Sequence, residues 1–163
     1  MMSHEGAPSS GEGRDEVAPT RFRPPLGADA RPGPAALVVE NDYGSKLALT
    51  ALLERIRLSV VAVESGRTAL DALAERDDFA IVLMDILMPI MDGYETMTAI
   101  RKRPRFAKLP IIALTGKEPA GERERCIAAG ASDYIPKPID TPLLLTAIAA
   151  WMTPEEPASS AHW

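Results

Sequence analysis

Between positions 36 and 152, the hydrophobic residues follow two alternating patterns. Five short runs are almost continuously apolar, and they cover residues 36–39, 60–63, 80–84, 111–114 and 134–135. A run without polar alternation indicates a strand that is covered on both faces, as in a parallel sheet. Each run is followed by a segment whose apolar residues recur every three or four positions, which is the spacing of an amphipathic helix.

The predicted helices differ in how clearly the sequence marks them. Four apolar stripes carry the helical spacing: Leu49, Leu52, Leu53 and Ile56; Leu70 and Leu73; Tyr94, Met97 and Ile100; Leu144, Ile148 and Trp151. The segment near 121–129 is the least marked, and Gly130 is expected to end it. For the last helix, Thr141 is predicted as the N-cap and Pro142 as the first helical residue.

Five successive strand–helix units predict an α/β fold, namely a doubly wound five-stranded parallel sheet with five helices. Because crossovers between parallel strands are right-handed, few strand orders are sensible, and we predict the order 2-1-3-4-5. Pro136 favours this order, because proline is tolerated at a sheet edge and the fifth strand would lie at one.

The two ends of the chain differ in composition from the middle. Of residues 1–34, 11 are proline or glycine, and few are large and apolar. Such a segment cannot offset the entropy cost of ordering, so it is predicted to be disordered. We therefore predict a tail over residues 1–34, one domain over 35–152 and a second, short tail over 153–163.

Charge and cysteine content narrow the cellular setting. The formal net charge of -5 gives no general reason to expect nucleic-acid or membrane binding. The single cysteine, Cys126, excludes an internal disulfide and suits a reducing compartment. The N-terminus lacks the apolar block of a signal peptide, and no apolar stretch approaches the ~20 residues that span a bilayer. We expect a cytoplasmic protein.

Polar side chains stand where the predicted strands end. In this fold, ligands bind beyond the carboxyl ends of the strands, where the first and third strands diverge. The residues expected there are Glu40, Asn41, Asp42, Asp85, Thr115 and Lys137. Oxygen ligands of this kind favour Mg²⁺, and a carboxylate can attack a phosphoryl group to form an aspartyl phosphate. Mg²⁺ and Lys137 would stabilise the transferring group, and Thr115 would donate a hydrogen bond to it.

Four segments carry a family resemblance. "ALVVEND", "IVLMDILMPIMDGYE", "PIIALTG" and "ERCIAAGASDYIPKPID" resemble the receiver domain of the two-component response-regulator family. The resemblance implies a flavodoxin-like receiver fold that accepts a phosphoryl group on Asp85, with Mg²⁺, from a histidine kinase or histidine phosphotransfer protein. It implies a signalling phosphoacceptor rather than an enzyme, which promotes its own phosphorylation and dephosphorylation and passes the signal to a downstream protein partner.

The resemblance also assigns further roles by position. It implies that Thr115 and Lys137 contact the phosphoryl group and that Thr115 and Tyr134 form the switch. It implies that the backbone carbonyl of Leu87 binds the metal together with Asp85. The Lys–Pro bond of the family is commonly cis, so we expect a cis peptide bond after Lys137.

The chain departs from the family pattern after its first strand. The family usually has two consecutive acids there, whereas this chain has Glu40, Asn41 and Asp42. The metal could be held by the Asn41 carbonyl oxygen, by Asp42 after a loop shift, or by Glu40 through water. The amide also keeps open a pseudo-receiver, an interaction module that is not phosphorylated. A hydrolase with an aspartyl nucleophile is disfavoured, because its usual second acid is replaced by Leu87.

Several other residues have structural interpretations. Asp92 is predicted to start the third helix, and Cys126 to be a small buried side chain. Packing in the core or in a loop, rather than a cofactor site, is predicted for Met84, Met88 and Met91. A solvated helix end, rather than a nucleic-acid site, is predicted for the basic cluster Arg101, Lys102, Arg103, Arg105 and Lys108.

Overall fold

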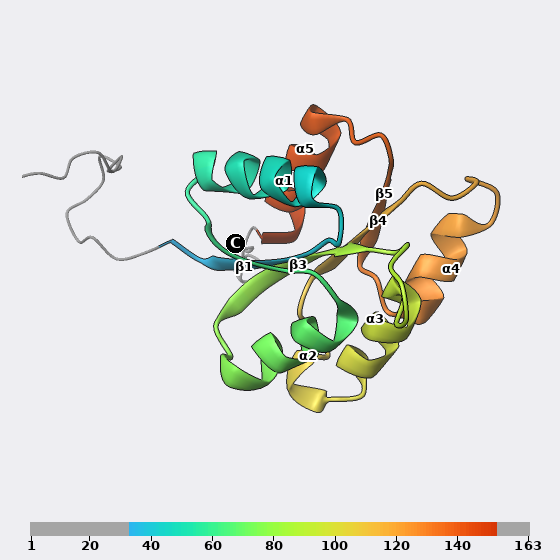
Figure 1. Cartoon of the computed structure of the whole chain (residues 1–163), viewed down its shortest axis with the longest axis horizontal. Helices are drawn as coiled ribbons and strands as arrows, with labels where there is room; N and C mark the ends of the chain where they lie inside the picture. Colours follow the sequence, from blue (N-terminus) through green and yellow to red (C-terminus); the bar gives the residue numbers. More distant parts are fainter. Residues whose placement is uncertain (1–32, 153–163) are drawn as a thin grey trace, which may run out of the picture. The chain divides into compact units, whose positions relative to one another are not determined.

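A sheet of five parallel strands organises residues 33–152, the part of the chain that the computed structural model describes (Figure 1). The strands are β1 (Ala35–Val39), β2 (Ser59–Val63), β3 (Phe79–Asp85), β4 (Ile111–Thr115) and β5 (Asp133–Pro136). The helices are α1 (Tyr43–Arg55), α2 (Gly66–Glu75), α3 (Gly93–Arg101), α4 (Glu122–Ala129) and α5 (Thr141–Met152), with the 3-10 turn η1 (Pro104–Phe106) after α3. The predicted elements are confirmed, and the strand ends differ from the prediction by one residue at most.

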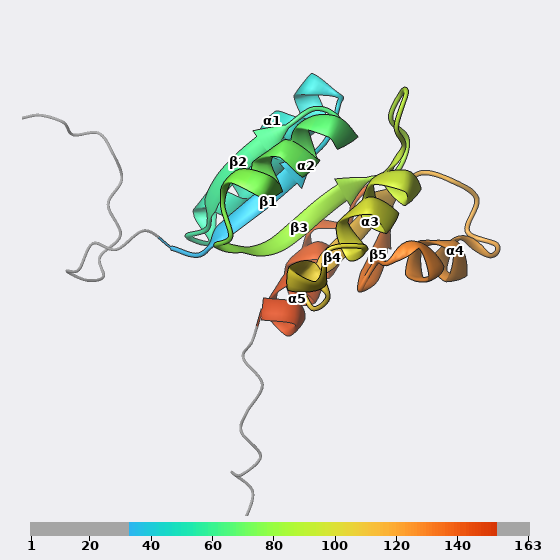
Figure 2. The same ribbon diagram turned by 90° about the horizontal axis from the view of Figure 1, so that it is seen from below.

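The strands lie in the order β2-β1-β3-β4-β5, as predicted, and each neighbouring pair is parallel (Figure 2). Their carboxyl ends therefore meet along one edge of the sheet. Pro136 is the last residue of β5 and pairs in register with Thr115 of β4. Because β5 is an edge strand, the missing N–H of this proline removes no hydrogen bond to a further strand.

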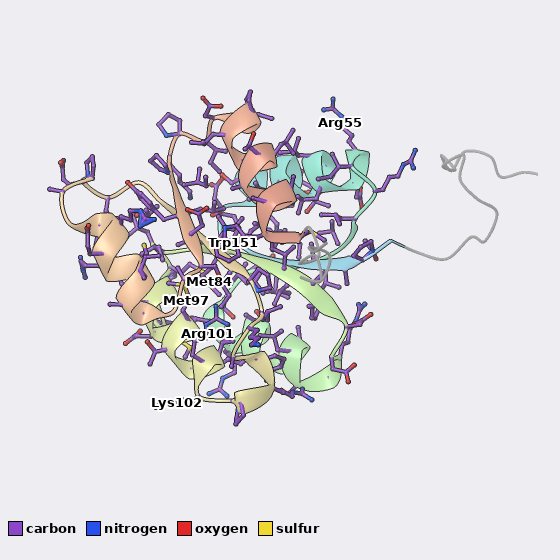
Figure 3. All side chains as sticks on the ribbon, turned by 180° about the vertical axis from the view of Figure 1, so that it is seen from behind. Arg55, Met84, Met97, Arg101, Lys102 and Trp151 are labelled. Carbon is purple, nitrogen blue, oxygen red and sulfur yellow. The ribbon has the colours of Figure 1, made fainter. Side chains whose placement is uncertain are left out.

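Helices cover both faces of the sheet, with α1 and α5 on one face and α2, α3 and α4 on the other (Figure 1). Successive side chains of a strand point to opposite faces, so β3 contributes to both cores. Leu83 packs in the core under α1 and α5, where Leu53 is also fully buried. Met84 packs in the opposite core with Met97 of α3 (Figure 3). Each such side chain stabilises the fold by roughly 1.5–3 kcal/mol.

The helix boundaries follow local chemistry, with one correction to the sequence prediction. Gly130 ends α4 with a φ of 122°, a left-handed conformation that glycine adopts without strain. The prediction that Thr141 caps α5 was wrong by one residue. The carboxylate of Asp140 accepts the hydrogen bond of the Leu143 N–H at 3.0 Å, so Asp140 is the cap and Pro142 lies one position further into the helix.

The basic cluster at the end of α3 was only partly predicted. Arg101 is not a solvated side chain, because its guanidinium donates to the carbonyl oxygens of Gly130 at 2.9 Å and Phe106 at 2.6 Å. Burial lowers the pKa of this guanidinium below its usual value. The next residue, Lys102, is exposed, and Figure 3 marks it at the edge of the molecule. Arg101 therefore fastens α3 to the end of α4 and to η1.

Cys126 and the methionines have the structural roles that the sequence predicted. Cys126 is fully buried on α4, and burial raises the pKa of its thiol to about 12. Met84 and Met88 are buried, and Met91 is half-buried. The predicted tails lie outside the described residues, apart from Gly33 and Pro34. Within residues 33–152, no helix is long and apolar enough to cross a membrane.

Candidate functional site

The acidic and basic residues predicted for the site meet at the carboxyl edge of the sheet. Asp85 is the last residue of β3, and Glu40 directly follows β1. Lys137 directly follows β5, and its backbone N–H donates to the carbonyl oxygen of Thr115 at 2.8 Å. The Lys137–Pro138 bond is cis, as expected. Parallel strand pairing thus places residues separated by up to 97 positions within reach of each other.

Lys137 bridges two buried carboxylates. Its Nζ donates to Oδ1 of Asp85 at 3.0 Å and to Oε1 of Glu40 at 3.3 Å. Glu40 and Asp85 are 1% and 2% exposed, whereas 28% of the Lys137 side chain is exposed. A buried carboxylate needs a partner to offset its lost hydration. Lys137 is that partner for both acids, and it remains open to solvent.

Burial and neighbouring charges shift the pKa values of Glu40 and Lys137. Burial raises the pKa of the Glu40 carboxyl, and the negative charge of Asp85 raises it further, whereas Lys137 lowers it. Burial alone would lower the pKa of the Lys137 amine. Its hydrogen bond to Asp85 and the charges of both acids outweigh burial, so the pKa of Lys137 lies above its usual value. The amine is therefore fully charged near neutral pH.

The loop after β1 separates three residues that the sequence grouped as metal ligands. Glu40 points inward, whereas Asn41 and Asp42 are exposed. Asp42 is the N-cap of α1: its Oδ2 accepts the Ser45 N–H at 2.9 Å, and its own N–H donates to Glu40 Oε2 at 3.1 Å. Hydrogen bonding from Ser45 holds the pKa of Asp42 below its usual value. Asp42 therefore has a structural role at the start of the helix.

The loop after β3 carries exposed apolar side chains beside Asp85. Leu87 is 54% exposed, and Ile90 is fully exposed with a φ of 68°, which is unusual for a β-branched residue. Asp92 caps α3, as predicted, and the structure adds a capping box between Asp92 and Glu95. A Cβ on Gly93 would lie 2.5 Å from the backbone oxygen of Asp85, so glycine allows α3 to start against the end of β3.

The two predicted switch residues have different environments. Thr115 ends β4 and is 1% exposed, and its Oγ1 accepts the Lys117 N–H at 3.0 Å. Tyr134 lies on β5, half-buried against the core beneath α2, α3 and α4. Thr115 lies on β4 and Tyr134 on β5, so both are on the opposite side of β3 from β1.

Sequence reasoning missed one buried acid near the site. Glu122, the first residue of α4, is 1% exposed and accepts hydrogen bonds from the Tyr94 hydroxyl at 2.6 and 2.7 Å. The Cys126 thiol donates to it at 3.5 Å. In the sequence, Tyr94 belongs to an apolar helical stripe, whereas Glu122 lies in the least marked of the predicted helices. Their separation of 28 positions offered no local signal that they pair.

The donor set at the edge of the sheet fits a hard cation held by few protein ligands. Among the described residues, no three acids, histidines or cysteines gather as a dedicated metal cluster. Two carboxylates, Glu40 and Asp85, are nevertheless buried side by side at one end of the sheet. Mg²⁺ is commonly held by one or two carboxylates, with water and phosphate in its remaining positions. The residues present therefore suit Mg²⁺.

A parallel sheet with an acid at the end of its central strand, bridged to a lysine after the edge strand, defines a receiver-like α/β domain. The model of the response regulator receiver domain family matches residues 36–149. This chain therefore belongs to the response regulator receiver family, and it is a receiver domain of two-component systems.

Known proteins agree with this assignment. The chain is 36% identical over 142 residues to the sensor protein GacS of Pseudomonas syringae pv. syringae, and the match covers 83% of the chain but 15% of that protein. It is 27% identical to the two-component response regulator ORR11 of Oryza sativa, covering 65% of the chain and 72% of ORR11. The chain thus spans a small part of the sensor protein and most of the plant regulator.

Solved structures share the fold. The receiver domain of the sensor histidine kinase PA1611 from Pseudomonas aeruginosa, with magnesium coordinated in its active-site cleft, superposes with a TM-score of 0.68 at 33% identity. The match covers 75% of this chain and 99% of that domain. A response regulator from Chloroflexus aurantiacus gives a TM-score of 0.71 at 25% identity, with 75% and 99% coverage.

Proposed function

We propose that this domain accepts a phosphoryl group on Asp85 from the phosphohistidine of a histidine kinase or histidine phosphotransfer protein. The observation that carries the proposal is the bridge from Lys137 to the buried carboxylates of Asp85 and Glu40. A nucleophilic carboxylate needs a nearby cation that can follow the charge onto the transferred group. Lys137 is near the carboxylate, because it is hydrogen-bonded to Asp85. It can also reach the transferred group, because its side chain is partly exposed.

In the transfer, an Asp85 oxygen forms the new P–O bond while the P–N bond to the donor histidine breaks. The electron pair of that bond stays with the histidine nitrogen. Lys137 moves its hydrogen bond from the carboxylate to a phosphoryl oxygen, and the Thr115 hydroxyl donates to another. Hydrolysis by water later returns the Asp85 carboxylate and releases inorganic phosphate. The domain is therefore a signalling phosphoacceptor and not an enzyme acting on a separate substrate.

The same residues would hold Mg²⁺. Glu40 and Asp85 supply the two carboxylates, and the Leu87 backbone carbonyl and the Asn41 side-chain carbonyl are further oxygen donors on the adjoining loops. When bound, Mg²⁺ neutralises charge on the phosphoryl oxygens. The Asp42 carboxylate already accepts the Ser45 N–H as the N-cap of α1, which favours Glu40 and Asn41 over Asp42 as metal ligands. The phosphorylated domain would then signal through contact with a downstream protein.

The test is intact-protein mass spectrometry after incubation with acetyl phosphate and Mg²⁺. The wild type is expected to gain the mass of one phosphoryl group, and Asp85→Asn none. Asp77→Asn is the matched control, because Asp77 is an exposed acid in the turn before β3. A wild type that never gains this mass refutes the proposal. Retention of the mass by Asp85→Asn would place the phosphoryl group on another residue.

The alternative function, a pseudo-receiver that binds partners without phosphorylation, is favoured by Asn41. This residue puts an amide where the family usually has an acid, and it removes one formal charge from the metal site. The same mass measurement separates the two functions. A wild type that stays unphosphorylated, while Asn41→Asp becomes phosphorylated, would establish the pseudo-receiver.

A further inference from the structure

The loop between β3 and α3 contains an isoleucine whose backbone and side chain are both unfavourably placed. Ile90 has a φ of 68°, and the Met91 N–H donates to the carbonyl oxygen of Pro89 at 2.7 Å. A hydrogen bond that spans one residue of positive φ defines a γ-turn of the rare, strained kind. β-branched residues seldom adopt such a backbone conformation. The Ile90 side chain is also fully exposed, so packing against the described residues does not offset the strain.

The residues on either side of Ile90 hold the loop in place. Met88 is buried in the core beneath α2, α3 and α4, and the Gly93 N–H donates to the carbonyl oxygen of residue 86 at 2.9 Å. Met91 packs on the start of α2, because a Cβ on Gly66 would lie 2.8 Å from the Met91 sulfur. Asparagine or glycine at position 90 would avoid the strain. Strain that the surrounding structure maintains is concentrated at functional sites, so Ile90 is a candidate for a function of its own.

The exposed side chains of this loop are apolar, and the loop directly follows Asp85. Figure 2 shows it standing out from the domain beyond the carboxyl end of β3. Residues 86–91 contain no polar side chain, although Leu87, Pro89 and Ile90 are exposed. Of the eight large hydrophobic side chains that residues 33–152 expose, five lie on the segments that follow β1, β3 and β5, namely Tyr43, Leu47, Leu87, Ile90 and Leu143. Exposed apolar side chains therefore border the phosphoryl site, as at a protein contact.

A protein donor has to cover this border. Asp85 is almost completely buried, so the imidazole of a phosphohistidine has to enter the edge of the sheet to meet its carboxylate. The protein that carries this histidine then lies against the loops around Asp85, whereas contact with a downstream partner requires no group to reach Asp85. An apolar side chain on a loop that is already fixed loses little conformational entropy when a partner binds. The placement of Ile90 therefore suits contact with the donor.

We propose that Ile90 is a contact residue for the phosphodonor, and that its side chain packs among apolar side chains around the donor histidine. The proposal rests on the proposed phosphoacceptor function and adds the chemistry of the partner surface, which is apolar rather than charged. The strained γ-turn holds the Ile90 side chain outward before the donor arrives. Ile90 then determines how tightly a protein donor binds, and it takes no part in the transfer of the phosphoryl group.

The test compares a protein donor with a small donor in the presence of Mg²⁺. The protein donor is the sensor histidine kinase GacS of Pseudomonas protegens, to which the chain is 34% identical over 141 residues. It is phosphorylated with ATP after deletion of that matching segment, which would otherwise compete for the phosphoryl group. Ile90→Asn should raise the GacS concentration for half-maximal transfer about tenfold, as expected when an interface loses a buried apolar side chain. The rate at saturating GacS and the rate with acetyl phosphate should not change.

Two controls distinguish a local contact from a general loss of apolar surface. Ile90→Val keeps a β-branched apolar side chain and should accept the phosphoryl group like the wild type. Ile56→Asn makes the same exchange at the exposed C-cap of α1, at the opposite edge of the sheet, and should leave transfer unchanged. An equal loss in Ile56→Asn overturns the proposal, as does an Ile90→Asn variant with an unchanged half-maximal concentration. If that variant instead changes the sedimentation of the domain alone, the loop contacts a second copy of this chain.

The outcomes also separate this proposal from the proposed function. A wild type that acetyl phosphate does not phosphorylate overturns both. A wild type that accepts from acetyl phosphate but not from GacS overturns the role of Ile90 alone, as does an Ile90→Asn variant that loses both reactions equally. Relief of strain should raise the melting temperature of Ile90→Asn by roughly 4 °C, and a decrease contradicts the strain argument. If Ile90→Asn does not fold, Ile90→Gly, which adopts a positive φ freely, should show the same effect on transfer.

Discussion

Replacing Lys137 with methionine isolates the charge that holds the site together. The substitution keeps most of the apolar stem and removes the amine that contacts Asp85 at 3.0 Å and Glu40 at 3.3 Å. Both carboxylates are almost completely buried, so each would lose its cationic partner inside the protein. We expect the variant to be less stable than the wild type and to transfer little phosphoryl group to Asp85.

The expected loss of stability depends on how deeply Lys137 and its two carboxylate partners are buried. Removing one partner of a fully buried ion pair costs ~3–5 kcal/mol. The Lys137 side chain is 28% exposed, so water already screens part of the interaction, and we expect a loss of about 2 kcal/mol in the free energy of unfolding. At ~4 °C per kcal/mol for a domain of this size, the melting temperature should fall by roughly 8 °C.

The stability difference between the wild type and Lys137→Met should change with pH in a definite direction. Burial raises the folded-state pKa of Glu40 above its unfolded value, and loss of the Lys137 charge would raise it further. A carboxyl with a raised folded-state pKa favours the folded state while it is protonated, and this stability is lost as the pH rises through that pKa. The stability gap between wild type and Lys137→Met should therefore be small near pH 4 and widest near neutral pH.

Thermal unfolding of both proteins without Mg²⁺, at several pH values, measures this gap. Addition of Mg²⁺ should then stabilise the variant more than the wild type, because the cation finds two carboxylates that no amine neutralises. A gap that is independent of pH, or one that widens at acid pH, would refute the charge argument. It would indicate that Lys137 contributes through packing alone.

Four further substitutions and one control test other parts of the structure. Asn41→Asp should tighten Mg²⁺ binding by ~1–2 kcal/mol in a fluorescence titration, whereas Asp42→Ala should cost about 1 kcal/mol of stability through the lost cap and leave Mg²⁺ affinity unchanged. Arg101→Met should lower the free energy of unfolding by about 2 kcal/mol, because buried carbonyl oxygens lose their donor, and Arg103→Ala is the near-neutral control in denaturant titration. Gly93→Ala should destabilise the domain by ~1–3 kcal/mol, because its Cβ would press on the backbone of β3, and a gain in melting temperature would contradict this.

The fold was predictable because its signals are local and redundant. Continuous apolar runs mark strands that are buried on both faces, and each of β1, β3 and β4 is almost wholly buried. The strand order needed only the handedness of the crossovers and a proline that suits an edge. Parallel pairing then brought Asp85 and Lys137 together without any long-range information in the sequence. This is why the core of the site was predicted by residue number.

The errors share a different physical cause. Asp140 and Thr141 are both good N-caps, and only the backbone geometry selects between them. Arg101 looked like one cation of a solvated cluster, but it turns inward to carbonyl oxygens that no side-chain pattern reveals. Glu122 and Tyr94 pair across two helices, and a charged residue in a weakly amphipathic segment gives no sign that it is buried. Tertiary hydrogen bonds to buried polar groups are what the sequence could not supply.

One property of the site suggests how a small covalent change could alter the domain. Lys137, the cation proposed to contact the phosphoryl group, already has two acidic partners, Asp85 and Glu40. If Asp85 accepts a phosphoryl group as proposed, Lys137 exchanges one partner for another instead of gaining its first hydrogen bond. The free energy of such an exchange is a difference between comparable terms, and it falls naturally in the ~1–3 kcal/mol range of coupling energies between sites. Under the proposed function, one phosphoryl group would thus reverse a resting state that Asp85 and Glu40 hold through Lys137, and its hydrolysis would restore that state.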